Sequence, residues 1–211
     1  DFDVRCLNLP GFGDEPCPDS AWGVGEYADF VKSKIKNFKS KVLLLGHSFG
    51  GQVAVKVAAE HPELIDKLVL SGAAVFRPKR QLRRLVFGAL AKMGKFIFAL
   101  PIIERFDLIA KKALYRATRS PDYSSTAGIK REIFQKIIRQ DVSHLLKDIN
   151  VPTLVVWGER DAYVPVSDGK RIAGEISGSS LRIVEGGSHG LHLEQPGKLI
   201  EIIKEFDAKP I

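Results

Sequence analysis

A serine stands in a glycine-rich hexapeptide, Gly-His-Ser-Phe-Gly-Gly at 46–51, between an apolar run and a segment of helical periodicity. Turning a strand into a helix within so few residues strains Ser48 and brings the residues two before and two after it close together, which favours Gly46 and Gly50. The pattern predicts a nucleophile elbow, with the Ser48 hydroxyl above the sheet and the Phe49 amide donating to an oxyanion. The alternative is a tight turn without a chemical role.

A serine hydroxyl is a poor nucleophile at neutral pH, so a base must take its proton and an acid must orient that base. Asp161 follows closely after an apolar run at 153–157. Because parallel α/β sheets place their sites at the carboxyl ends of their strands, we interpret Asp161 as this acid. Its alternative role is to stabilise the turn before the next helix.

Two histidines compete for the role of base, and both lie in the loop after an apolar run at 180–184. His189 follows the flexible Gly-Gly-Ser segment at 186–188, whereas His192 lies nearer the final helix, where packing or hydrogen bonding is the expected role. We therefore predict that His189 is the base, which completes the chain order serine, aspartate, histidine. No late strand precedes the other histidines, which are His47, His61 and His144.

The elements that must position these residues alternate between strand and helix patterns. Apolar or alternating runs predict strands over 2–9, 42–45, 67–75, 153–157 and 180–184. Helical spacing predicts helices near 27–38, 53–58 and 172–176, and a last helix from Pro196 that buries Leu199, Ile200, Ile203 and Phe206. This order predicts an α/β fold with a mostly parallel, doubly wound sheet.

Residues 77–148 interrupt the alternation and carry no strand pattern. We expect a single domain over 1–211, in which 1–76 and 149–211 form the α/β core and 77–148 form an inserted helical cap. The cap is predicted to contain two amphipathic helices, at 82–100 and 102–114. A cap whose apolar face closes over the serine would form a hydrophobic acyl pocket.

The predicted cap is strongly basic. Residues 77–119 hold twelve Lys or Arg and two Asp or Glu, a net charge of +10 in a chain whose total is +7. The outer face of the cap therefore suits weak association with anionic membrane surfaces or acidic substrates, although ordinary solvated helix faces explain the same charges. Nucleic acid is not an expected partner, because no zinc-ligand spacing, aromatic RNA-binding pattern or basic heptad is present.

The number of cysteines and the lengths of the apolar runs bear on the cellular compartment of the protein. Cys6 and Cys17 are too few for a disulfide scaffold and lack metal-ligand spacing. No apolar run is long enough to span a bilayer, and the first residues resemble no signal peptide. We expect a cytoplasmic protein without a metal or organic cofactor. Because Met93 is the only methionine, residues upstream of Asp1 are expected in the natural protein.

Four motifs together resemble the α/β-hydrolase superfamily, specifically its cap-bearing branch of serine esterases and carbon–carbon hydrolases. They are Leu-Pro-Gly-Phe-Gly at 9–13, Gly-His-Ser-Phe-Gly-Gly at 46–51, Val-Pro-Thr-Leu-Val-Val-Trp-Gly-Glu-Arg-Asp at 151–161 and Gly-Ser-His-Gly-Leu-His-Leu-Glu-Gln-Pro at 187–196. Many relatives have Asp where this chain has Asn8. Relatives also have earlier strands and a loop that supplies a second oxyanion donor, and the resemblance implies that both lie upstream of Asp1.

The expected activity is hydrolysis of a small-molecule carboxylic ester or thioester with a hydrophobic acyl part, through an acyl-enzyme. We expect the substrate to contact Phe12, Phe49, Val164 and Leu191. A serine at position 48 excludes the branches of the superfamily that use an aspartate nucleophile. Two alternatives stay open: carbon–carbon bond hydrolysis of diketone-type substrates with the same triad, and a non-catalytic ligand-binding protein on a retained scaffold.

Overall fold

The computed structural model describes residues 2–13, 15–77 and 128–208. The chain divides into two compact units, which are 1–77 with 135–211 and 78–134. The first unit holds the sheet and all the predicted site residues. The two predicted cap helices lie outside the described residues, and so does all of the basic segment except Arg77.

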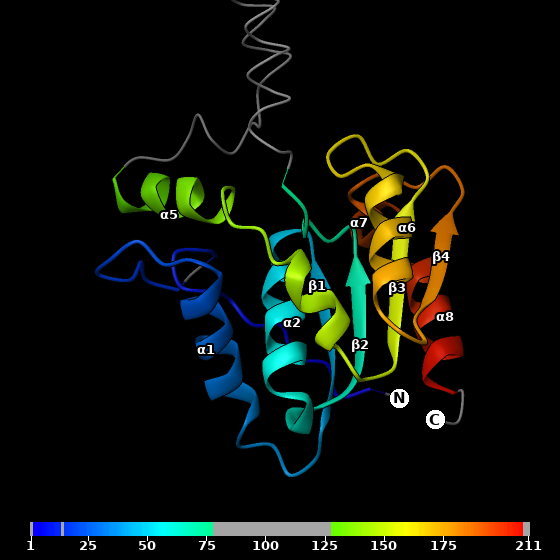
Figure 1. The fold of residues 1–211 in the computed structure, drawn as a ribbon, viewed down its shortest axis with the longest axis horizontal. Coiled ribbons are helices and arrows are strands. Elements are labelled where there is room, and N and C mark those ends of the chain that lie inside the picture. The colour runs from blue at the N-terminus through cyan, green and yellow to red at the C-terminus, as the bar shows by residue number, and fades with distance from the viewer. Residues whose placement is uncertain (1, 14, 78–127, 209–211) are drawn as a thin grey trace, which may run out of the picture. The chain divides into compact units, whose positions relative to one another are not determined.

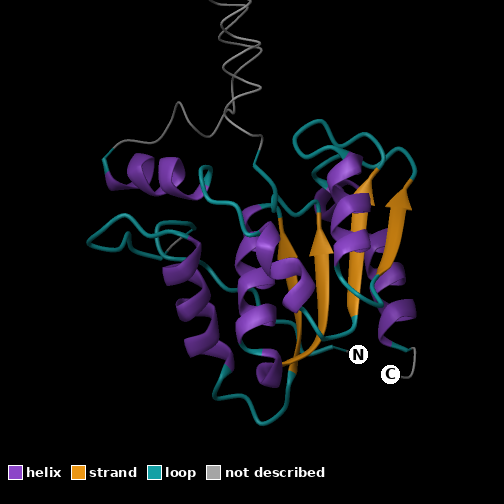
Figure 2. Ribbon diagram, viewed as in Figure 1, coloured by secondary structure: helices purple, strands orange, loops and turns teal. Residues whose placement is uncertain are grey.

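A four-stranded parallel sheet with the order β1-β2-β3-β4 forms the centre of the first unit (Figure 1). Its strands are β1 (Val42–His47), β2 (Ile65–Ser71), β3 (Thr153–Gly158) and β4 (Ser180–Val184). The helices shown in Figure 2 are α1 (Val24–Ile35), α2 (Phe49–Glu60), α5 (Ile129–Ile137), α6 (Val166–Glu175), α7 (Leu191–Glu194), α8 (Pro196–Asp207) and the 3-10 turns Pro62–Leu64 and Ser143–Asp148. The predicted α/β fold is confirmed. Among the described helices, none is long and apolar enough to cross a bilayer.

Helices cover both faces of this sheet. Figure 1 shows α2 and α6 on the same face, where Gly169 of α6 lies directly against the ring of Trp157 in β3. On the other face, Leu199 and Ile202 of α8 belong to one buried cluster with Val156. Because side chains alternate along a strand, Trp157 and Val156 point to opposite faces. Burial on both faces explains why the sequence of β3 is a nearly continuous apolar run.

The strand predicted over residues 2–9 is wrong. These residues join none of the four strands of the described sheet, and Phe2, Val4 and Leu7 are exposed. An alternating pattern shows only that a segment is able to pair. A strand also needs a neighbour that completes its ladder of hydrogen bonds, and no described strand supplies one for this segment.

One strand end and one buried position also differ from the predictions. The second strand ends at Ser71, because Gly72 has a φ of +53° and turns the chain out of the extended conformation. In α8, Ile200 is 50% exposed and Ile202 is buried instead. Both isoleucines fit the helical period of the apolar positions. The face of α8 that packs against the sheet decides which of them is buried.

Candidate active site

Ser48 joins β1 to α2 in a strained backbone conformation. With a φ of 51° and a ψ of −116°, it is the only described residue other than glycine with a positive φ. Such a conformation costs on the order of 1–3 kcal/mol and persists only where its surroundings enforce it. Here the Ser48 N–H donates to the Ser71 carbonyl (3.1 Å), and the Ser48 carbonyl accepts from the N–H groups of Gly51 and Ala74 (3.0 Å each). These bonds anchor the turn to α2 and to the end of β2.

Close backbone packing around the turn requires glycine at two positions. A Cβ on Gly46 would lie 2.5 Å from the Gly50 carbonyl and 2.7 Å from the Cβ of Ala54. A Cβ on Gly51 would lie 2.4 Å from the Cβ of Ala73, whereas one on Gly50 would meet no described atom within 4 Å. The steric prediction therefore holds for Gly46 and is wrong for Gly50, because the crowded position on the helix side is the next residue.

The structure brings the three predicted side chains together in one hydrogen-bonded series. The Ser48 Oγ lies 3.0 Å from Nε2 of His189, and Nδ1 of His189 lies 2.7 Å from Oδ2 of Asp161. Because an ionised carboxylate only accepts hydrogen bonds, the neutral His189 ring carries its proton on Nδ1. Its Nε2 lone pair then faces the Ser48 hydroxyl, which is the arrangement that a general base needs.

The loop between β3 and α6 holds the carboxylate of Asp161. Its side chain is only 1% exposed, and its second oxygen, Oδ1, accepts from the backbone N–H groups of Tyr163 (2.9 Å) and Val164 (2.8 Å). The Val164 carbonyl in turn accepts from Nε1 of the fully buried Trp157 (2.9 Å). Two amide donors fix the position of this buried carboxylate, so Asp161 is suited to orient an imidazole.

The geometry distinguishes the two candidate bases. His189 lies in the loop between β4 and α7 and reaches both Ser48 and Asp161. His192 lies in α7, is exposed, and packs its ring against His47 at a centroid distance of 4.5 Å. The predicted preference for His189 therefore matches the hydrogen bonds of the structure.

The predicted oxyanion donor lies at a helix N-terminus. Phe49 is the first residue of α2, so its N–H has no acceptor within the helix. The dipole of this twelve-residue helix favours negative charge at the same end. The Phe49 amide thus has the environment that an oxyanion donor requires.

The four residues predicted to contact substrate divide into two pairs. Phe12 is 40% exposed and stacks on Phe49 with a centroid distance of 5.8 Å beside the elbow. In contrast, Val164 and Leu191 are 9% and 1% exposed, and Leu191 belongs to the cluster beneath α8. Phe12 and Phe49 therefore remain exposed enough to meet a ligand, whereas the other two side chains pack inside the protein.

Replacing Leu191 with alanine is expected to lower the free energy of unfolding by about 2–4 kcal/mol, because a buried side chain leaves a cavity. Urea denaturation measures this loss. Leu193 in the same short helix is 77% exposed and provides the matched control, with an expected change within about 0.5 kcal/mol. A raised KM without loss of stability in the Leu191 variant would instead assign that side chain to substrate.

Gly72 is a site residue that the sequence analysis missed. A Cβ at this position would lie 3.2 Å from Nδ1 of His189 and 3.3 Å from Oδ2 of Asp161, which are the two atoms of their hydrogen bond. Gly72 also follows the strand end whose carbonyl anchors Ser48. The available signal was a Ser-Gly pair inside the run assigned to one continuous strand.

Changing Gly72 to alanine is expected to reduce kcat about 10-fold, because the added methyl group displaces the imidazole or the carboxylate by a few tenths of an ångström. Steady-state kinetics with a chromogenic ester measures the effect. Gly178→Ala is the control, because Gly178 also has a positive φ (+69°) but a Cβ there meets no described atom within 4 Å. Equal kcat values in the two variants would contradict the assignment of Gly72 to the site.

His47 is partly buried beside the site and resists protonation. Burial, assisted by the positive charge that His189 and His192 can carry, lowers the pKa of His47 from 6.5 to about 4. The unfolded chain therefore binds a proton at a pH where the folded chain does not. The contribution of His47 to the free energy of unfolding is complete above pH 6.5, the pKa of His47 in the unfolded chain. It declines as the pH falls from 6.5 through about 4, the pKa in the folded protein.

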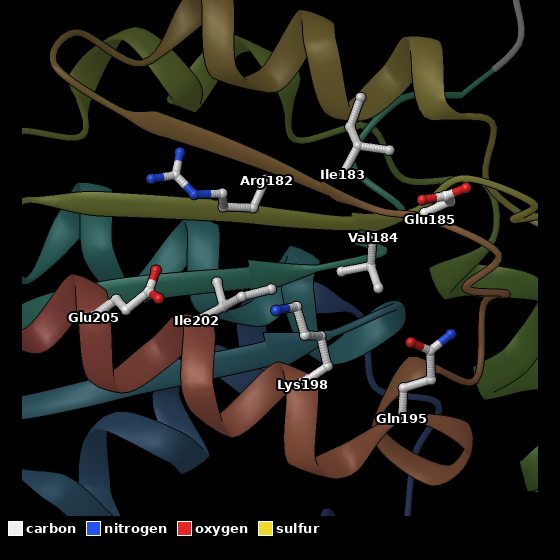
Figure 3. A pocket seen from close by; sticks show the side chains of 8 residues that line it. All are labelled: Arg182, Ile183, Val184, Glu185, Gln195, Lys198, Ile202 and Glu205. Atoms are coloured by element: carbon white, nitrogen blue, oxygen red, sulfur yellow. The ribbon is translucent and has the colours of Figure 1, made fainter.

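A groove of about 350 Å³ lies between β4 and α8, away from these side chains (Figure 3). Its lining combines two cations and two carboxylates with apolar and amide groups, and consists of Arg182, Ile183, Val184, Glu185, Gln195, Lys198, Ile202 and Glu205. None of the three hydrogen-bonded side chains of the candidate site lines it. Within the part of the chain that the structure describes, no group of three or more His, Cys, Asp or Glu side chains is arranged to hold a metal ion.

Comparisons with known proteins identify the family and the fold. The family model described as serine aminopeptidase, S33 matches residues 1–196. A 2-hydroxy-6-oxononadienedioate/2-hydroxy-6-oxononatrienedioate hydrolase of Escherichia coli K12 is 27% identical over 99% of this chain and 77% of its own length. In fold, the chain is similar to an esterase from Exiguobacterium antarcticum (TM-score 0.68, 23% identity, 95% of this chain and 80% of that chain). It has the same TM-score, 0.68, with an enol-lactonase from Burkholderia xenovorans, at 20% identity over 95% of this chain and 79% of that chain.

Proposed function

Since the chain belongs to the serine aminopeptidase S33 family of α/β-hydrolases, we propose that it hydrolyses carboxylic esters or thioesters with Ser48, His189 and Asp161 as catalytic triad. The observation that carries the proposal is the unbroken series of hydrogen bonds from the Ser48 hydroxyl through His189 to Asp161, at a strained strand-to-helix turn. Strained residues of this kind cluster at active sites.

The geometry supports a two-step reaction. Nε2 of His189 takes the hydroxyl proton as the Ser48 Oγ attacks the carbonyl carbon, and Asp161 stabilises the resulting imidazolium. The Phe49 N–H donates to the oxyanion of the tetrahedral intermediate. His189 then gives the proton to the departing alkoxide or thiolate. Water, activated by the same imidazole, hydrolyses the acyl-enzyme and regenerates the Ser48 hydroxyl.

The aromatic side chains beside the elbow support an apolar acyl part. The ring of Phe12 stacks on Phe49, and Tyr27 lies edge-on to both, with centroid distances of 5.9 and 5.2 Å. The Tyr27 hydroxyl donates to the Pro10 carbonyl (2.9 Å), so the loop that carries Phe12 is fixed to α1. This cluster adjoins the proposed oxyanion donor, where the acyl carbonyl must lie.

Carbon–carbon bond hydrolysis is the second candidate activity. The relative from E. coli that is 27% identical to this chain carries the name of such a substrate pair, 2-hydroxy-6-oxononadienedioate and 2-hydroxy-6-oxononatrienedioate. The same serine, histidine and aspartate serve both reactions, so the bound substrate decides between them. A non-catalytic ligand-binding protein on the same scaffold is the third candidate.

The cellular location that we propose is the cytoplasm. Both cysteines of the chain are free thiols, Cys6 being exposed and Cys17 partly buried. Free thiols suit a reducing compartment. We also propose weak association of the basic segment with anionic membranes, which sedimentation with phosphatidylserine vesicles would test.

A substrate panel tests these proposals. It contains p-nitrophenyl esters of increasing acyl length, an acyl thioester, a vinylogous diketone and, because of the family description, an amino-acid p-nitroanilide. Turnover that increases with acyl length, and that prior labelling with a fluorophosphonate blocks, is the expected result. Preferred cleavage of the diketone would assign carbon–carbon hydrolysis. Labelling of Ser48 without turnover of any substrate would indicate the ligand-binding alternative.

A further inference from the structure

His47 makes a set of contacts that the proposed reaction does not use. It is the last residue of β1 and directly precedes Ser48. Its Nδ1 lies 2.9 Å from the Ser71 carbonyl, the same oxygen that accepts from the Ser48 N–H. Because a carbonyl oxygen only accepts hydrogen bonds, Nδ1 of His47 carries the proton. The tautomer and the orientation of this ring are therefore determined by the end of β2.

The ring of His47 packs against two other imidazoles. The centroid of His189 lies 4.7 Å away with an interplanar angle of 46°, and that of His192 lies 4.5 Å away at 53°. His189 follows a Gly-Gly-Ser segment, so its backbone alone does not orient its side chain. Hydrogen bonds hold its two ring nitrogens, Nδ1 to Asp161 and Nε2 to Ser48. The plane of the ring also depends on ring contacts, which His47 and Tyr163 supply, the latter at a centroid distance of 5.2 Å.

The charge state of His47 matters because His189 must become positive during the reaction. A second imidazolium at 4.7 Å would oppose that step, and a partly buried, neutral His47 avoids this repulsion. Among the described residues, the titratable groups on the elements packed around the two rings are Asp161 and Tyr163 after β3, and His192 and Glu194 in α7. Of these, Asp161 is the carboxylate in hydrogen-bond contact with His189.

We propose that His47 is a positioning residue for the base: a neutral imidazole, oriented by the Ser71 carbonyl, that holds the plane of the His189 ring and limits its contact with water. The inference rests on the proposed function, since it assigns His189 to proton transfer. It adds a role for the residue before the nucleophile that is separate from the elbow itself.

Two substitutions separate the ring contact from the hydrogen bond. In His47→Asn the side-chain amide still donates to the Ser71 carbonyl, but the ring that touches His189 is lost. In His47→Phe the ring remains and the donor is lost. We expect kcat to fall about 10-fold in His47→Asn, with KM nearly unchanged, and less than about 3-fold in His47→Phe. The acid limb of kcat/KM should move to higher pH only in His47→Asn, because water entering beside His189 stabilises the imidazolium.

Controls distinguish this proposal from general damage and from failure of the proposed function. His144→Asn changes an exposed histidine and is expected to leave kcat and the acid limb unchanged. Fluorophosphonate labelling and thermal unfolding report whether each variant is folded. If the wild type turns over an ester and Ser48→Ala does not, the proposed function stands. A wild-type pH profile in His47→Asn, or equal losses in the Asn and Phe variants, would then overturn the role of His47 alone.

A measurement on the unmodified protein keeps the test independent of variant folding. Nitrogen-15 NMR of the imidazoles is expected to show His47 as the neutral Nδ1–H tautomer throughout the pH range in which the enzyme is active. Titration of His47 within that range, or the Nε2–H tautomer, would overturn the proposal.

Discussion

Replacing Ser48 with alanine is expected to lower kcat by a factor of about 10⁴ to 10⁶, the range seen when a triad nucleophile is removed. The fold should survive, because the turn is held by backbone hydrogen bonds that do not involve the hydroxyl. The hydroxyl itself is hydrogen-bonded to His189. Ester turnover by protein free of wild-type enzyme measures the loss. The midpoint of thermal unfolding should shift by no more than a few degrees.

The matched control is Ser33→Ala, an exposed serine on α1 whose hydroxyl donates to the Phe30 carbonyl. Its kcat should equal that of the wild type. Retention of more than a few per cent of activity in Ser48→Ala would remove Ser48 as the nucleophile. Loss of the folded state, detected by circular dichroism, would show that the strained turn depends on the side chain.

His189→Ala is expected to lose activity on the same scale as Ser48→Ala, because residues of one triad act as a unit. His192→Ala should lose far less, since that ring contacts His47 and is not hydrogen-bonded to Ser48 or Asp161 in the structure. In the wild type, kcat/KM should rise with pH through a single ionisation, as the imidazole of the base becomes neutral.

The ranking of these two variants is the decisive comparison. A larger loss in His192→Ala than in His189→Ala would transfer the role of base to His192. A flat pH profile across the histidine range, measured with an ester whose chemistry limits the rate, would argue against any histidine as the base.

Local patterns were sufficient for most elements of the α/β core. Four runs rich in apolar residues became β1 to β4. The central strands β2 and β3 are buried almost throughout, which is the condition that favours such runs. The Gly-x-Ser-x-Gly pattern between a strand and a helix was sufficient to locate the elbow. Asp161 and His189 were predicted from their places after two later strands, because the carboxyl ends of parallel strands meet at one edge of the sheet.

Other features depended on contacts between segments distant in the sequence. The segment at 2–9 has a strand pattern but no ladder partner in the described sheet, and Ile200 and Ile202 have equal hydrophobic character but different neighbours. Val164 and Leu191 lie close to the triad in sequence, and tertiary packing turns their side chains into the core.

The least predictable part of the site is what surrounds the triad. Gly72 adjoins the bond between His189 and Asp161, and His47 packs against His189, although each is far from its partner along the chain. Residue type and spacing identify groups that can react, because chemical function resides in single side chains. Their orientation, exposure and protonation depend on neighbours that only the folded chain brings within a few ångströms.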